Sequence, residues 1–266
     1  MFNNKVVWIT GASSGIGEAL VGACAAAGAR VVLSSRRESE LLRVQQAAGL
    51  SSDTSLVLPM DMSLRDDFNT QTQLVISKFG SIDFLFHVAG ISQRSLVKDT
   101  SIEIDEKLMW VNFLSVVALT KAVLPQFLKQ QSGHILVMSS LVGKFGTPMR
   151  SAYSASKHAL HGYFESLRAE VWKQNIYVTI ACPGYIKTNI SLNAVNASGG
   201  KYGKMDENQA SGMSADECAR KILNGVRKHK KEILIGGKEI LGVYLKRFFP
   251  GLLWLKIRDY NIAAKS

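Results

Sequence analysis

A glycine-rich turn near the start of the chain limits what it can fold into more than any other feature. Residues 10–17 (TGASSGIG) join a short β-branched stretch, 6–9, to a segment of helical composition at 18–25. Such a turn presents free backbone N–H groups at the positive end of a helix, and its glycines let a pyrophosphate approach. The spacing, G-x-x-x-G-x-G, differs from the common G-x-G-x-x-G, and a tight turn that binds nothing is the alternative. We expect a phosphate-binding strand–turn–helix unit.

Apolar strands and more polar helices alternate along the rest of the chain. Strands are expected at residues 29–35, 55–60, 82–88, 133–139, 176–181 and 232–235, and helices at 37–48, 64–79, 104–128, 151–173 and 215–228. This alternation is typical of a parallel sheet that binds ligands at the carboxyl ends of its strands. The predicted fold class is α/β, a Rossmann-type doubly wound parallel sheet of about seven strands with helices on both faces.

Two segments interrupt the alternation and set the domain organisation. Residues 189–212 are polar and glycine-rich, as in a mobile lid. Residues 241–266 are apolar and basic, and Pro250 and Gly251 divide them into two amphipathic pieces too short to span about 30 Å of hydrocarbon. We expect one domain at 1–240, lid included. The tail is expected to close over the site and to pack on the same domain, a dimer mate or an anionic membrane surface.

Charge and cysteine content limit the classes of function. The chain has 32 basic and 21 acidic residues, a net charge of +11, which favours an anionic partner such as a phosphorylated cofactor or an acidic membrane surface. The basic residues are scattered, and no zinc-ligand or RNA-binding motif accompanies them, so no nucleic acid partner is expected. Cys24, Cys182 and Cys218 lie far apart without a C-x-x-C, which predicts neither disulfides nor a metal cluster and fits a reducing compartment.

The start of the chain and its hydropathy bear on location. The first strand begins within five residues of Met1, and no uninterrupted run of about 18 apolar residues occurs. We therefore expect neither a signal peptide nor a spanning helix. The expected location is cytoplasmic, or peripheral at a membrane surface through the tail.

Candidate acid–base chemistry lies at and before the helix at 151–173. Tyr153 and Lys157 are spaced i, i+4 on one helix face, and Ser140 directly follows the preceding strand. An ammonium group beside a phenol favours the phenolate, and lowering the phenol pKa from about 10 to about 7 requires roughly 4 kcal/mol. The set predicts a general acid–base whose serine hydrogen-bonds the reacting oxygen. The Tyr–Lys spacing alone means little, because such a pair also arises by chance.

Further short motifs complete an ordered set that spans residues 5 to about 235. After the turn at 10–17 come Asp61, Ala89-Gly90, Asn112, Ser139-Ser140, Tyr153 to Lys157, and Pro183-Gly184-Tyr185-Ile186-Lys187-Thr188. Jointly they resemble the short-chain dehydrogenase/reductase family, in its branch of single-domain members of about 250 residues. The resemblance implies hydride transfer between a nicotinamide cofactor and a carbonyl or secondary alcohol, an activity on CH–OH donors.

The same resemblance implies roles for individual residues. Tyr153 is the general acid–base and Lys157 lowers its pKa and binds the ribose. Ser140 orients the substrate oxygen, and Asn112 holds a water in a proton relay. The implied cofactor site comprises Gly11, Ser13, Ser14, Gly15, Ile16, Gly17, Arg36, Asp61, Met62, Ala89, Gly90, Tyr153, Lys157, Pro183, Gly184, Ile186 and Thr188. No metal is expected.

The end of the second strand bears on the choice of cofactor. The acidic residue that would bind a ribose 2′-OH is absent, and Ser35 is followed by Arg36 and Arg37. A guanidinium can bind a 2′-phosphate in bidentate geometry. NADP(H) is therefore expected in preference to NAD(H), with two arginines at a solvated helix start as the alternative.

Histidines mark a departure from the family pattern. The usual Asn-Asn-Ala-Gly is here His87-Val88-Ala89-Gly90. We interpret His87 as a core residue that takes over a structural hydrogen bond or leaves cofactor affinity weaker, and not as catalytic.

His158 and His161 share a helix face without a third ligand candidate nearby in the sequence, which indicates a packing surface.

The substrate and the assembly are only broadly indicated. The expected pocket walls, at 142–150, Tyr185 and the lid, mix apolar side chains with cations, which favours a lipophilic ketone or alcohol, with or without an anionic group. The resemblance also implies a homodimer or homotetramer through the helices at 104–128 and 151–173.

Two alternative functions stay open: a catalytically weak NADP(H)-binding redox sensor or regulatory protein, and a scaffold or membrane-surface protein. The complete set of catalytic residue types favours the enzyme.

Overall fold

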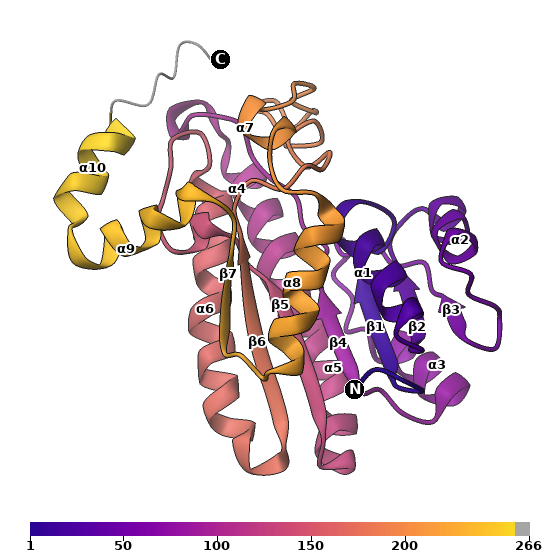
Figure 1. Ribbon diagram of the computed structural model, residues 1–266. Helices are drawn as coiled ribbons and strands as arrows, with labels where there is room; N and C mark the ends of the chain where they lie inside the picture. Colours follow the sequence, from indigo (N-terminus) through magenta and orange to yellow (C-terminus); the bar gives the residue numbers. More distant parts are fainter. Residues whose placement is uncertain (259–266) are drawn as a thin grey trace.

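The seven strands of the central sheet all run parallel, in the spatial order β3-β2-β1-β4-β5-β6-β7 (Figure 1). They are β1 (Val6–Thr10), β2 (Arg30–Ser34), β3 (Ser55–Val57), β4 (Phe84–His87), β5 (Gly133–Met138), β6 (Ile176–Pro183) and β7 (Glu232–Ile235) in a computed structural model that describes residues 1–258. The strand order reverses between β1 and β4, and such a switch point opens a crevice at the carboxyl ends of the strands. The predicted doubly wound parallel sheet is confirmed.

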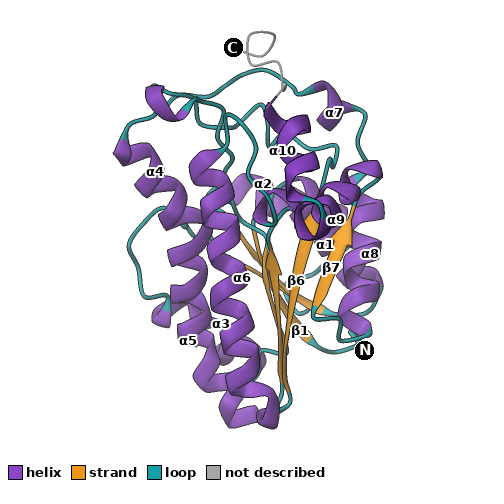
Figure 2. Cartoon of the chain, turned by 90° about the vertical axis from the view of Figure 1, so that its left-hand side faces the viewer, coloured by secondary structure: helices purple, strands orange, loops and turns teal. Residues whose placement is uncertain are grey.

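Helices cover both faces of this sheet (Figures 1 and 2). On one face lie α1 (Gly15–Ala26), α2 (Glu38–Ala47) and α8 (Ala215–Arg227), and on the other α3 (Asn69–Phe79), α5 (Ser115–Gln130) and α6 (Ser151–Val171). The helix α4 (Ile102–Met109) packs on the start of α6, where Ile104 and Leu108 join a small cluster with Ala152 and Tyr153. Alternate side chains of β1 enter the two cores, Val6 and Trp8 on the α5–α6 side and Val7 and Ile9 on the α1–α8 side. Continuous apolar strands are expected of a sheet buried on both faces.

Two expected helices begin or divide differently from the sequence pattern. The helix expected at 64–79 begins only at Asn69, because the Asp66 and Asp67 carboxylates accept hydrogen bonds from the N–H groups two residues later and form a turn. The helix expected at 104–128 consists of α4 and α5 with a π-helical turn, Trp110–Leu114, between them. The turn places Asn112 at a local widening of the helix, a feature often found at functional sites.

The continuous helical stretch at 102–130 is also long and apolar enough to cross a membrane, judged by length and composition alone. Its residues Val116, Leu119, Val123 and Phe127 are buried against the sheet. A core helix passes the same test, so this stretch is a weak indication of a membrane span.

The lid and the tail lie at the carboxyl end of the sheet (Figure 1). The lid at 189–212 carries the short helix α7 (Glu207–Ala210) and is tied to the loop after β4, where Val195 N donates to Ser92 O and Arg94 N donates to Val195 O, both at 2.8 Å. The tail forms α9 (Leu241–Phe248) and α10 (Pro250–Arg258). The predicted tail positions 259–266 lie outside the described residues.

Candidate active site

A cleft of about 590 Å³ opens at the carboxyl ends of β1, β2, β4, β5 and β6. All of the predicted cofactor-site residues line it, although they come from separate parts of the chain: Gly11, Ser13, Ser14, Gly15, Ile16, Gly17, Arg36, Asp61, Met62, Ala89, Gly90, Tyr153, Lys157, Pro183, Gly184, Ile186 and Thr188. Ser140 lines it as well. The cleft is therefore the place where the sequence motifs meet.

The glycine turn forms one end of this cleft. Gly11 has a φ of +69°, and a Cβ there would lie 2.8 Å from Ala89 Cα, while a Cβ on Gly17 would lie 2.0 Å from Gly11 O. Only glycine fits these two places. Ser14, the N-cap of α1, forms no side-chain cap, so no side chain at that position competes for the N–H groups of the first turn. This cradle fits the phosphates of a dinucleotide.

Tyr153 lies in the first turn of α6 and is 8% exposed. Burial raises the pKa of its phenol, while Arg150, a hydrogen bond with Ser140 and, more weakly, Arg94 lower it. The Ser140 hydroxyl also donates to Pro183 O at 3.3 Å, which holds it at the end of β5. The phenol and the serine hydroxyl therefore point into the same space.

Lys157 follows one turn later, as its spacing predicts. Its ammonium donates to Met138 O at 2.7 Å and lies 5.8 Å from the centre of the Tyr153 ring. Burial lowers the lysine pKa to about 8. A Cβ on Gly90 would lie 3.4 Å from Lys157 Nζ, so the small residue at position 90 keeps the approach to the ammonium open.

Asn112 lies beside these residues but does not line the cleft. Its side chain is fully buried: Oδ1 accepts from Ile91 N at 2.9 Å, and Nδ2 donates to Ile91 O at 2.9 Å and to Ser156 Oγ at 3.1 Å. The amide thus fastens the loop after β4 to α6. The implied role of Asn112 in holding a water stays a prediction.

Three polar residues at the site were not singled out from the sequence. Gln93 Oε1 accepts from the N–H groups of Ala152 and Tyr153, at 3.0 and 3.3 Å, and so caps the helix that carries the tyrosine. Arg94 and Asp206 form a buried ion pair that Arg150 joins. Arg150 fell within the predicted pocket wall, but these pairings join distant segments and leave no local pattern in the sequence.

His87 makes the structural hydrogen bond that we expected as one of its two possible roles. It is buried in β4 beside Phe164, and its Nε2 lies 2.8 Å from Thr120 Oγ1. Burial lowers its pKa to about 3, so the ring is neutral at pH 7.

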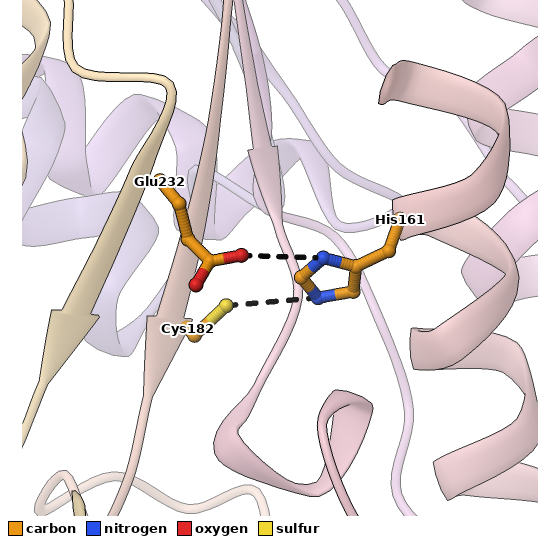
Figure 3. Close-up of side chains that lie close together, drawn as sticks. All are labelled: His161, Cys182 and Glu232. Carbon is orange, nitrogen blue, oxygen red and sulfur yellow. Dashed lines mark hydrogen bonds and ion pairs between the residues drawn. The ribbon is translucent and has the colours of Figure 1, made fainter. Parts of the chain in front are cut away.

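His161 has ligand-type neighbours that its sequence surroundings did not reveal. Its Nε2 lies 3.7 Å from Cys182 Sγ on β6, and its Nδ1 lies 3.6 Å from a Glu232 carboxylate oxygen on β7 (Figure 3). The thiol and the carboxylate thus approach opposite ring nitrogens, and Lys144 pairs with Glu232 at 2.7 Å. Burial raises the pKa of Cys182 to about 12. A protonated thiol, and a carboxylate already paired with Lys144, make this a poor metal site.

Comparison with known proteins gives consistent matches. The family model described as "short chain dehydrogenase" matches residues 5–198. A Drosophila melanogaster protein named "Dehydrogenase/reductase SDR family protein 7-like" is 43% identical over 94% of this chain and 79% of that one. A short-chain dehydrogenase from Streptomyces avermitilis, 26% identical, superposes with a TM-score of 0.80 over 97% of this chain and 98% of that one. An alcohol dehydrogenase from Thermococcus sibiricus complexed with 5-hydroxy-NADP is 25% identical. It superposes with a TM-score of 0.74 over 89% of this chain and 97% of that one.

Proposed function

This chain belongs to the short-chain dehydrogenase family, and on that premise we propose that it is an NADP(H)-dependent oxidoreductase with Tyr153 as its general acid–base. The family itself makes it an oxidoreductase that uses a nicotinamide cofactor. The finer proposal rests on one observation, the convergence of the Tyr153 phenol, the Ser140 hydroxyl and the Lys157 ammonium on a cleft that begins at the glycine cradle. A redox sensor or a scaffold has no need of this acid–base set.

In the proposed mechanism the side chains handle the proton and the orientation of the substrate. The nicotinamide, when bound, donates or accepts a hydride at C4. The Ser140 hydroxyl turns from Pro183 O to donate a hydrogen bond to the carbonyl oxygen, and Tyr153 gives that oxygen a proton during reduction or takes one during oxidation. The raised phenol pKa keeps Tyr153 protonated at neutral pH, which suits reduction. The Lys157 ammonium stabilises the phenolate that remains.

The preference for NADP(H) is supported by charge at the adenosine end of the cleft. Arg36 and Arg37 line it directly after β2, both are exposed, and Ser35 leaves no carboxylate there to repel a 2′-phosphate. A guanidinium at this position favours the phosphorylated ribose.

A lipophilic substrate is supported by the apolar part of the cleft wall. Ile91, Val142, Phe145 and Ile190 line it. A screen that follows NADPH oxidation across lipophilic ketones and aldehydes tests the proposal. Turnover that is lost in Tyr153→Phe supports it, and the absence of NADPH-dependent turnover across the panel would count against it.

We also propose that the chain acts as a homodimer or homotetramer. The outer surfaces near α5 and α6 expose Leu114, Leu128 and Trp172. Apolar groups on helices that can pair about a two-fold axis favour a closed assembly. Sedimentation at micromolar concentration should give two or four copies, and a monomer would contradict the proposal.

In this proposal the catalytic domain at 1–240 is followed by a tail that touches an anionic membrane without crossing it. The protein is then cytoplasmic and binds peripherally to the membrane surface. Most large apolar side chains of the described part of the tail, 241–258, are exposed: Leu241, Tyr244, Phe248, Phe249, Leu252, Trp254 and Leu255. Lys246, Arg247 and Lys256 lie among them. Because these apolar groups are not packed on the domain, a dimer mate or a membrane is left to cover them.

A further inference from the structure

Two arginines, Arg94 buried and Arg150 half-buried, meet beside Tyr153. Arg94, in the loop after β4, and Arg150, the residue before α6, donate to the same oxygen of Asp206, which precedes α7 in the lid. The Arg150 contact measures 3.0 Å. Arg94 also donates to Ser92 Oγ at 2.8 Å and to Gln93 O at 2.6 Å, and its side chain is 6% exposed.

The two guanidiniums differ in how many of their N–H donors are hydrogen-bonded. Arg94 is held by three partners, whereas Arg150 makes one side-chain hydrogen bond within residues 1–258, through Nη2 to Asp206. A guanidinium has five N–H donors, so Arg150 keeps several to offer. Its side chain is 15% exposed and lines the cleft. Arg150 therefore presents free donors to whatever occupies the cleft.

Positive charges outnumber negative charges around the Asp206 carboxylate among the described residues. Two guanidiniums share one carboxylate among the described residues, and Lys201 from the lid lines the cleft as well. Burial and repulsion from Arg94 lower the pKa of Arg150, while Asp206 opposes that change. A second anion would offset the repulsion between the two guanidiniums. In a partly buried setting, such a charge-assisted and bidentate contact is favourable.

We propose that Arg150, backed by Arg94, binds an anionic group of the substrate, a carboxylate or a phosphate, while the apolar wall holds its lipophilic part. The inference rests on the proposed oxidoreductase function and narrows its substrate class to amphiphilic ketones or alcohols. Arg150 is the residue before α6 and Tyr153 lies in its first turn; both side chains line the cleft, and the charge of Arg150 acts on the Tyr153 phenol. The anionic group is thereby placed on the same side of the cleft as the reacting carbonyl.

The test compares ketones that differ only in their far end. 9-Oxodecanoate, its methyl ester and a phosphate monoester of matched length are assayed with saturating NADPH, and kcat/KM is taken for each. We expect the anionic ketones to exceed the ester by about ten- to a hundredfold, the size of a hydrogen bond to a charged group. The carboxylate and phosphate arms identify which anion is preferred. Equal values for all three would overturn the inference.

Two variants separate anion binding from a merely structural ion pair. Arg150→Met should bring the anion-to-ester ratio close to one, mainly through KM. Asp206→Asn should raise the ratio, because it releases both guanidiniums to the substrate. A structural role predicts an unchanged ratio in both variants. Arg220→Met, an exposed arginine on α8, lowers the net charge equally and controls for non-specific attraction.

The pH profile supplies an independent readout. The positive charge of Arg150 lowers the phenol pKa of Tyr153, so an anion that neutralises it should raise that pKa. Reduction of the anionic ketone should therefore persist to higher pH than reduction of the ester.

If even the ester is not reduced, the proposed oxidoreductase function is contradicted independently of the anion site. Calorimetric binding of decanoate against methyl decanoate to the NADP⁺-loaded protein and to its Arg150→Met variant then decides the anion site, and equal affinities would refute it.

Discussion

Nε2 of His87 lies 2.8 Å from Oγ1 of Thr120, whose hydroxyl donates to Val116 O, also at 2.8 Å. The hydroxyl proton is thus committed to the carbonyl, so Nε2 carries the proton of the ring, and Nδ1 has no hydrogen-bond partner among residues 1–258. His134 repeats this arrangement with Thr179. Both rings are held in their neutral form, and burial lowers the pKa of each to about 3.

Acid should therefore destabilise the fold before most carboxylates titrate. Between about pH 6.5 and pH 3 the unfolded chain binds protons at His87 and His134 that the folded chain does not, so stability is lost as pH falls through this window. Urea unfolding midpoints at pH 7.5 and pH 4.5 measure this loss. His87→Asn should make the pH dependence shallower, and Asn in place of the exposed His158 serves as the control for the substitution itself. An identical slope in the unaltered protein and the His87→Asn variant would contradict this assignment.

Replacing Tyr153 by phenylalanine should remove the proton donor and little else. The expected loss of turnover is about 10²- to 10⁴-fold, the usual contribution of a general acid. The Kd for NADPH should change little, because the phenylalanine ring keeps the packing of Tyr153. Retained turnover would move the acid–base role elsewhere.

A pair of glycines in α1 offers a matched test of the phosphate cradle. A Cβ on Gly17 would lie 2.0 Å from Gly11 O, whereas a Cβ on Gly22 meets nothing within 4 Å. Gly17→Ala should lower the Tm and abolish the further rise that NADPH produces. Gly22→Ala should keep that rise and add about 0.5–1 kcal/mol of stability, since it removes a flexible residue from a helix. Equal NADPH responses in the two variants would argue against the cradle.

The choice between the two dinucleotides should depend on Arg36. Fluorescence titration should give tighter binding of NADPH than of NADH. Arg36→Ala should weaken NADPH binding about tenfold, as expected for the loss of a charge-assisted hydrogen bond, and leave NADH unaffected. Arg220→Ala on α8 serves as the control for net charge. Tighter NADH binding by the unaltered protein would refute the preference.

Membrane contact should depend on aromatic side chains of the tail. Phe248 and Trp254 are 66% and 61% exposed, and cations surround them. Full-length protein should float with liposomes that contain anionic lipid, and Phe248→Ser with Trp254→Ser should reduce the floating fraction. Trp172→Ser, an equally exposed tryptophan away from the tail, should not. Recovery of the unaltered protein in the unbound fraction would contradict membrane contact and would favour a dimer mate that packs on these side chains.

The sequence predicted the strands, and singled out the residues that line the cleft, because these signals are local. Apolar runs identify β1 and β6, and the turn at 10–17 carries its own geometry. The sequence did not predict the start of α3, where the Asp66 and Asp67 turns override a helical pattern, or the π-helical turn at Asn112. Nor did it predict the Arg94–Asp206 pair, whose members are 112 residues apart. Contacts of that kind depend on how elements pack, which no short window of residues encodes.

Gln93 links the middle of the lid to the helix that carries Tyr153. Its side chain caps α6 at Ala152 and Tyr153, and its backbone neighbours are bonded to Val195 of the lid. The middle of the lid and the head of α6 are therefore expected to shift as one rigid piece. Any opening of the lid toward α7 must in addition break the contacts of Asp206 with Arg94 and Arg150, because these contacts hold the segment before α7 to the same piece.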